Sequence, residues 1–206
     1  STGSKEVWVG TQSGVIHVIS ATNRRYMCEL VDPNVQHGGE IHQMVFDQYV
    51  FVATQGCRVV QWDPLTKEVN KSFVHEIPVF AAVTCQGLLF SGLADGTVKT
   101  WEIATGTCIA TATHVENNAV TCAAVDTDRH HLWVGRASGE VSIFRTAPEF
   151  SEIGSVRDAK GRLTSLVYAG GKVLGAGLDR TMYVWHAETC NILGRHHDHN
   201  ALIFFI

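Results

Sequence analysis

The sequence predicts an all-β fold made of about five repeated units, each with four short antiparallel strands. The first observation is a recurring segment of two apolar residues and one small residue, and the small residues stand at positions 10, 53, 92, 135 and 176. They are 43, 39, 43 and 41 residues apart, which is a narrow period. The second observation is that no stretch has helical periodicity long enough to compete with the alternating strand patterns.

Each small residue is followed nine positions later by an aromatic or large apolar side chain. Five such pairs at one period are hard to obtain by chance, so they indicate a true internal repeat. The five large residues are Ile19, Trp62, Trp101, Phe144 and Trp185.

The third unit shows the four strands most clearly. Its expected strands are residues 79–84, 88–92, 97–102 and 107–113. Between the second and third of them lies Leu93-Ala94-Asp95-Gly96, whose Asp and Gly tolerate the positive φ that a tight hairpin turn needs. Similar turns are expected at 11–14, 136–139 and 178–180, with Gln55-Gly56-Cys57 as the counterpart in the second unit.

A period near 42 with four strands in each unit is typical of a β-propeller. Here the chain resembles the WD-repeat (WD40-like) family over almost its whole length. Trp62-Asp63 is the dipeptide that ends that family's repeat, Trp101-Glu102 is a near variant, and residues 91–101 follow its second-to-third-strand pattern. The repeats are degenerate, because Ile19 and Phe144 replace the Trp and the family's Gly-His dipeptide is missing throughout.

The resemblance implies a buried hydrogen-bonded tetrad in the third unit, with a structural rather than a catalytic role. Such a network satisfies polar groups between strands. Asp179 and Trp185 match part of the pattern in the fifth unit. The expected tetrad is His75, Ser91, Asp95 and Trp101.

We expect one propeller domain over residues 1–206, with blade units at about 1–41, 42–79, 80–120, 121–163 and 164–200, and a further first strand at 201–206. The chain would thus start at a second strand and end at a first strand. One interpretation is that 201–206 pairs with Lys5 to Gly10 and closes a five-bladed ring, as the matched strand phase suggests. The other, which we favour because the chain lacks an initiating Met, is part of a larger propeller, most often seven-bladed in this family.

Composition excludes several classes of function. A formal net charge of −4 gives no reason to expect nucleic-acid binding, and the longest apolar runs are far shorter than a membrane span. The six cysteines show no CxxC spacing, and several lie in apolar stretches. A reduced chain in the cytoplasm, with cysteine used as a small buried hydrophobe, is therefore expected.

We expect no enzyme, no cofactor and no metal site. The sequence has no GxSxG, GxGxxG or P-loop pattern, and Cys85 and Cys122 fall in strands that should be buried. The segment His196-His197-Asp198-His199 could hold Zn²⁺. Neighbouring side chains on one loop seldom converge on an ion, however, so a solvated loop between blades is the preferred interpretation.

The function that we expect is a protein-interaction scaffold, which binds a protein or peptide motif through the loop face and central channel of the propeller. Binding residues lie on loops held by a rigid framework. The alternative is a regulatory or targeting propeller of a larger signalling enzyme, similar to those of inositol-polyphosphate phosphatases, Roco kinases or Rho exchange factors. The candidate partner-binding rim consists of Arg136, Arg162, Arg180 and His114.

Overall fold

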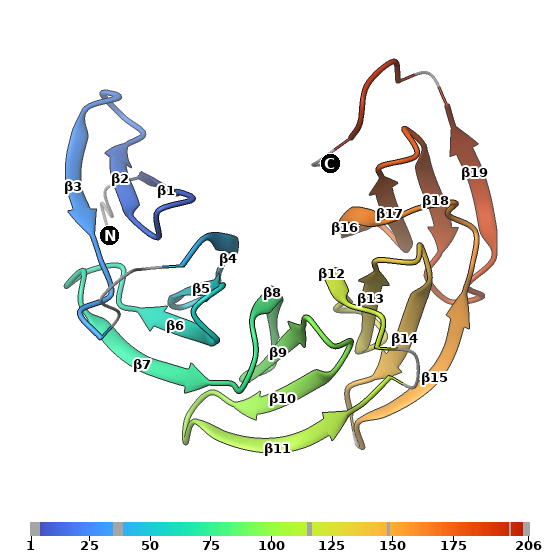
Figure 1. Ribbon diagram of the computed structural model, residues 1–206, viewed down its shortest axis with the longest axis horizontal. Helices are drawn as coiled ribbons and strands as arrows, with labels where there is room; N and C mark the ends of the chain where they lie inside the picture. The colour runs from blue at the N-terminus through green and yellow to red at the C-terminus, as the bar shows by residue number, and fades with distance from the viewer. Residues whose placement is uncertain (1–4, 35–38, 115–116, 148, 198, 204–206) are drawn as a thin grey trace. The chain divides into compact units, whose positions relative to one another are not determined.

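The computed structural model describes residues 5–34, 39–114, 117–147, 149–197 and 199–203. These residues form nineteen β-strands and no helix, and the strands make five antiparallel sheets (Figure 1). The predicted all-β class is therefore confirmed. The chain divides into two compact units, residues 1–79 and 80–206. The prediction of a single propeller domain over residues 1–206 stays a prediction.

The first unit holds a three-stranded sheet and a four-stranded sheet. The strands of each sheet follow one another in chain order. The strands of the first sheet are β1 (Glu6–Gly10), β2 (Ile16–Ser20) and β3 (Tyr26–Leu30), and those of the second are β4 (Ile41–Phe46), β5 (Val50–Thr54), β6 (Arg58–Trp62) and β7 (Val69–Val74).

The second unit holds three four-stranded sheets, again in simple chain order. Figure 1 shows the first strands of these sheets, β8, β12 and β16, along one side of the unit and the fourth strands along the other. The strands are β8 (Val79–Cys85), β9 (Leu88–Leu93), β10 (Val98–Glu102), β11 (Thr107–Ala112), β12 (Val120–Asp126), β13 (His131–Arg136), β14 (Val141–Arg145), β15 (Ser151–Val156), β16 (Leu163–Ala169), β17 (Lys172–Gly177), β18 (Met182–His186) and β19 (Ile192–His196).

The predicted strands of the third repeat unit are confirmed to within one residue at each end. One difference has a clear cause, because Thr97 belongs to the turn rather than to the strand. Its carbonyl accepts a hydrogen bond from the Leu93 amide at 2.9 Å, and its own amide donates to the Asp95 carboxylate at 2.9 Å. At the other end of the chain, residues 201–203 are not in a strand, and 204–206 lie outside the described residues.

A β-bulge recurs in all five sheets, at the repeat's large apolar residue. The strand that contains this residue pairs with the strand that follows it in the chain. In each sheet, the register of this pairing shifts immediately before the large residue, for example between Thr100 and Trp101 and between Val184 and Trp185. A bulge bends its strand and increases the local twist. The repeat seen in the sequence therefore marks a repeated distortion of the backbone as well as a repeated side chain.

Within each unit, neighbouring sheets bury their apolar faces against one another. Trp133 of β13 and Trp185 of β18 are both fully buried, and their rings lie 6.3 Å apart in the core between the fourth and fifth sheets. Val98 and Leu132 belong to the core between the third and fourth sheets. A single small sheet hides too little apolar surface to be stable alone, so this packing is what holds each unit together.

The hairpin turns between second and third strands share one backbone conformation. The fourth residue after the repeat's small residue has positive φ in every sheet, as the turn prediction requires. This residue is Gly14 (φ 82°), Cys57 (φ 59°), Gly96 (φ 91°), Gly139 (φ 90°) and Arg180 (φ 63°).

Two of these glycines also permit close contact with the loop that enters the next sheet. A Cβ atom at Gly139 would lie 2.6 Å from the Ala159 carbonyl oxygen, and one at Gly96 would lie 2.6 Å from the Asn118 carbonyl oxygen. No side chain fits at such a distance. The backbone of the turn therefore touches the backbone of the following loop directly.

We predict that Gly139→Ala destabilises the chain by about 3 kcal/mol, since left-handed backbone strain and overpacking act together. Gly87→Ala is the matched control, because Gly87 also has positive φ (76°) but a Cβ atom there would meet no other atom within 4 Å. It should cost only about 1 kcal/mol. Urea unfolding of both variants measures the difference, and equal losses would contradict the close contact.

Candidate interaction surface

At one edge of the second unit, the loops that connect successive sheets are hydrogen-bonded to hairpin turns. The loop between β11 and β12 accepts a hydrogen bond from the next sheet's turn, from the Ala137 amide to the Ala119 carbonyl at 2.9 Å. The Asn118 side chain adds a bond to Ser138 Oγ at 2.7 Å. The loop between β15 and β16 repeats the backbone contact, with the Leu178 amide donating to the Arg162 carbonyl at 2.9 Å. These bonds connect the described residues of the loops to the turns of the following sheets, and we call this side of the unit the loop edge.

Arg136, a predicted rim residue, is buried instead of exposed, with only 1% of its surface accessible. Its Nε donates to Ser142 Oγ at 2.9 Å, and its Nη1 donates to the carbonyl oxygens of Gly96 and Asn118 at 2.9 and 3.1 Å. Burial lowers the pKa of Arg136 from its ordinary value. The expected surface position of this residue is therefore wrong, and its guanidinium joins the third sheet to the fourth.

The period-two alternation of β13 could have revealed this position. Leu132 and Val134 face the third sheet and are fully buried, and Arg136 lies on the same face of the strand. An Arg that continues a buried face must find acceptors inside the protein.

His114 lies beside a buried carboxylate. Its Nε2 is 3.5 Å from Glu140 Oε2, and the two side chains are only 12% and 6% exposed. Arg157 Nη2 donates to the same carboxylate oxygen at 3.2 Å. The imidazole of this predicted rim residue thus already has a partner within the protein. The neighbouring residues 115–116 lie outside the described residues.

Arg162 and Arg180 are both exposed, and the structure brings them together. Arg162 ends the loop between β15 and β16, and Arg180 lies in the turn between β17 and β18, which is bonded to that loop through Leu178. Lys160, which was not predicted as a rim residue, is exposed on the same loop. Of the four predicted rim residues, these two arginines are the ones whose side chains lie at the surface.

The expected tetrad is present in part. Trp101 Nε1 donates to Ser91 Oγ at 3.0 Å inside the third sheet, while the exposed Asp95 accepts from the Thr97 amide. His75 is buried, and its Nδ1 lies 2.9 Å from the Phe73 carbonyl. It belongs to the first unit and the other three residues to the second, so the complete network stays a prediction.

The fifth sheet replaces the Trp–Ser bond with another arrangement. Gly175 stands where the third sheet has Ser91, and a Cβ there would lie 2.5 Å from the Trp185 ring. The ring covers this glycine, and its Nε1 donates instead to Asp158 on the preceding loop at 2.8 Å. Asp179 accepts a 2.5 Å hydrogen bond from the Tyr183 hydroxyl. Trp185 therefore has a different partner from Trp101, whereas Asp179 keeps the contact of Asp95, because its Oδ1 accepts from the amide of Thr181 two residues later at 3.1 Å.

The described residues include no group of three or more His, Cys, Asp or Glu placed to hold a metal ion. In the predicted His-rich segment, His197 Nδ1 lies 2.9 Å from Thr181 Oγ1, and Asp198 is outside the described residues. All six cysteines are free thiols, and Cys85 and Cys122 are buried as predicted.

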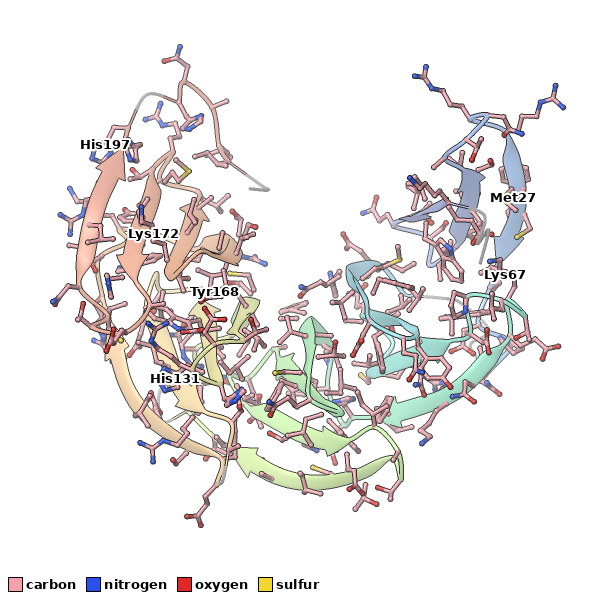
Figure 2. All side chains as sticks on the ribbon, turned by 180° about the vertical axis from the view of Figure 1, so that it is seen from behind. Met27, Lys67, His131, Tyr168, Lys172 and His197 are labelled. Atoms are coloured by element: carbon pink, nitrogen blue, oxygen red, sulfur yellow. The ribbon has the colours of Figure 1, made fainter. Side chains whose placement is uncertain are left out.

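A second polar group lies at the opposite strand ends of the second unit, where Figure 2 labels His131 and Tyr168. Asp126 is buried and pairs with Arg129 at 3.4 Å, and the Tyr168 hydroxyl donates to Asp128 at 2.5 Å. This hydrogen bond is the main cause that raises the pKa of Tyr168 to about 12. These charges satisfy one another, so the group ties the fourth sheet to the fifth.

The first unit contains a mainly apolar pocket of about 540 Å³, lined among others by Trp8, Phe46 and Leu65. Lys67, labelled in Figure 2, has its ammonium nitrogen 5.0 Å from the centre of the Trp8 ring and 2.5 Å from Glu6. Phe46 and Leu65 are 72% and 87% exposed. The pocket combines apolar walls with Lys5 and with Glu6, whose carboxylate pairs with Lys67.

No protein-family model matches the chain, and no curated protein matches it. Functional conclusions therefore rest on the chain's own residues. The described residues also include no helix with the length and apolar character needed to cross a bilayer.

We predict that Arg136→Met lowers the free energy of unfolding by about 2–4 kcal/mol, because three buried acceptors lose their donor. Arg162→Met removes the same charge from an exposed position and should change stability by less than about 0.5 kcal/mol. Urea titrations compare the two variants. A similar small effect for both would mean that Arg136 is not the structural link described.

The thiols should differ in reactivity. Burial raises the pKa of Cys122 to about 12, so its thiolate is scarcely populated at pH 8, whereas Cys108 is exposed. Iodoacetamide should therefore modify Cys108 in the folded chain and spare Cys122 until urea is added. Peptide mass mapping reads out both sites, and early labelling of Cys122 would refute its burial.

Proposed function

We propose that the chain forms part of a WD40-like β-propeller that acts as a non-catalytic protein-interaction scaffold. Three features support this architecture. The strands of every sheet follow chain order, and four of the five sheets have four strands. Neighbouring sheets pack face to face within each unit. The same bulge recurs at the repeat's large residue. The free thiols favour a reducing compartment, for which the cytoplasm is our proposal.

The first sheet supports completion of the propeller by further strands. Val7 and Val9 of β1 occupy the repeat positions of Leu132 and Val134 in β13. The β1 residues are 49% and 41% exposed, whereas their β13 counterparts are 0% and 1% exposed. In the fourth sheet, β12 and the third sheet cover that face. We therefore propose that β1 takes a fourth strand and a neighbouring sheet, supplied either by residues 201–206 or by further blades of a larger propeller.

The observation that carries the functional proposal is the hydrogen bonding between the loops and turns of the loop edge. Its turns and loops are bonded backbone to backbone, yet they present exposed side chains such as Ser138, Arg162 and Arg180. A fixed set of exposed polar groups binds a partner at low entropic cost, because little has to be ordered on association. A protein or a peptide motif is the proposed partner.

A pair of matched variants tests this function. Ala137→Arg places a large side chain in an exposed turn of the loop edge, and Thr127→Arg places the same side chain in an exposed turn at the opposite strand ends. We predict that proteins captured from a cytoplasmic extract by the wild-type chain are lost with Ala137→Arg and retained with Thr127→Arg. Quantitative mass spectrometry reads the captured set.

Both variants must unfold at the same urea concentration as the wild type, to exclude loss of fold. Equal retention of partners by the two variants would refute the loop edge as the binding face.

A further inference from the structure

Three exposed cations lie close together on the loop edge of the fifth sheet. We call Lys160, Arg162 and Arg180 the basic edge. They come from two segments that are bonded to each other, since the Lys160 amide donates to Asp179 Oδ2 at 3.0 Å and the Leu178 amide donates to the Arg162 carbonyl. Among the described residues, none of the three side chains has a carboxylate partner. Their charges are therefore available to a ligand.

The nearest carboxylates make their bonds within the protein. Asp179 Oδ2 accepts from the Tyr183 hydroxyl as well as from Lys160, and its Oδ1 accepts from the Thr181 amide at 3.1 Å. Asp158 accepts from Trp185 Nε1 and pairs with Arg195 at 2.6 Å. Among the described residues named here, the basic edge and Arg195 supply four cations and Asp158 and Asp179 supply two carboxylates, so cations outnumber carboxylates.

The backbone at Arg180 has the left-handed conformation of its turn. Arg180 has a φ of 63° at the turn position that Gly14, Gly96 and Gly139 occupy in other sheets. A side chain at positive φ is strained, and glycine is the residue that this turn favours. The turn itself therefore does not explain an arginine here. Cys57 has the same conformation (φ 59°) in the second sheet, so this turn position accepts a side chain, and the arginine adds a cation to the basic edge.

We propose that the basic edge binds an acidic peptide segment, rich in Asp and Glu, of a protein partner. This inference rests on the proposed function and names the chemistry of the partner. Arginine pairs with carboxylates through two parallel hydrogen bonds, so two arginines and a lysine suit a short run of acidic side chains. Nucleic acid is disfavoured, because three cations are few for a phosphate backbone and the chain as a whole carries a net charge of −4.

The probe is a fluorescein-labelled peptide of eight glutamates, titrated with the full chain at low salt and followed by fluorescence anisotropy. We expect saturable binding that weakens as salt is raised. The variant Lys160→Glu/Arg162→Glu/Arg180→Glu should weaken binding by about tenfold or more, since three attractive contacts become repulsive. Unchanged binding by this variant, or no binding by the wild type, overturns the proposal.

Lys172→Glu is the control for net charge. Lys172, labelled in Figure 2, is exposed at the start of β17, whereas Arg180 follows the end of that strand. Its variant should bind the peptide within about twofold of the wild type. A single-stranded oligonucleotide and vesicles with anionic lipid are titrated in parallel. Tighter binding of either one than of the peptide assigns the basic edge to another class of ligand and overturns the proposal.

Arg180→Gly separates binding from folding. We expect it to raise the urea midpoint, because glycine relieves the turn, and to weaken peptide binding severalfold. Cys57→Gly makes the same backbone change at the equivalent turn of the second sheet, where φ is 59°, and should raise the midpoint without altering binding. Should the peptide fail to bind while Ala137→Arg still removes captured proteins, this inference falls and the proposed function stands.

Discussion

Burial of apolar faces between successive small sheets is the constraint on which the rest of the structure depends. Each sheet is only three or four strands wide and cannot hide its own apolar side chains. Trp133 and Trp185 become fully buried only because the fourth and fifth sheets lie against each other. Where this packing is missing the faces stay open, as Val7 and Val9 of the three-stranded first sheet show. The loops take their positions from the stacked sheets beneath them.

The sequence predicted the strands well because its strongest signals are local. Alternating side chains mark the strands of the third unit, and Asp95-Gly96 marks the turn between two of them. The repeat's large residues were found as a periodic signal, but the bulge beside each was not. A bulge depends on how two strands pair, and no single strand carries that information.

The candidate surface was harder to predict, since exposure depends on contacts that are distant in the sequence. Arg136 and Arg162 are the same residue type near similar loops, yet Arg136 bonds to a carbonyl forty positions earlier and Arg162 remains at the surface. Lys160 was missed because it forms no motif. It becomes notable only when the bonds to Asp179 place it beside Arg162 and Arg180.

The three acceptors of Arg136 have a consequence for how the second unit unfolds. Stacked repeats tend to unfold one after another, because each contacts only its neighbours. Gly96 belongs to the turn of the third sheet, Asn118 to the connecting loop and Ser142 to the fourth sheet, so separation of the two sheets breaks the two carbonyl bonds of Arg136 and keeps the bond to Ser142. These two bonds add to the apolar contact that links the opening of one sheet to the opening of the next. The side chain thereby adds a directional polar link to a pair of sheets that apolar contact already couples.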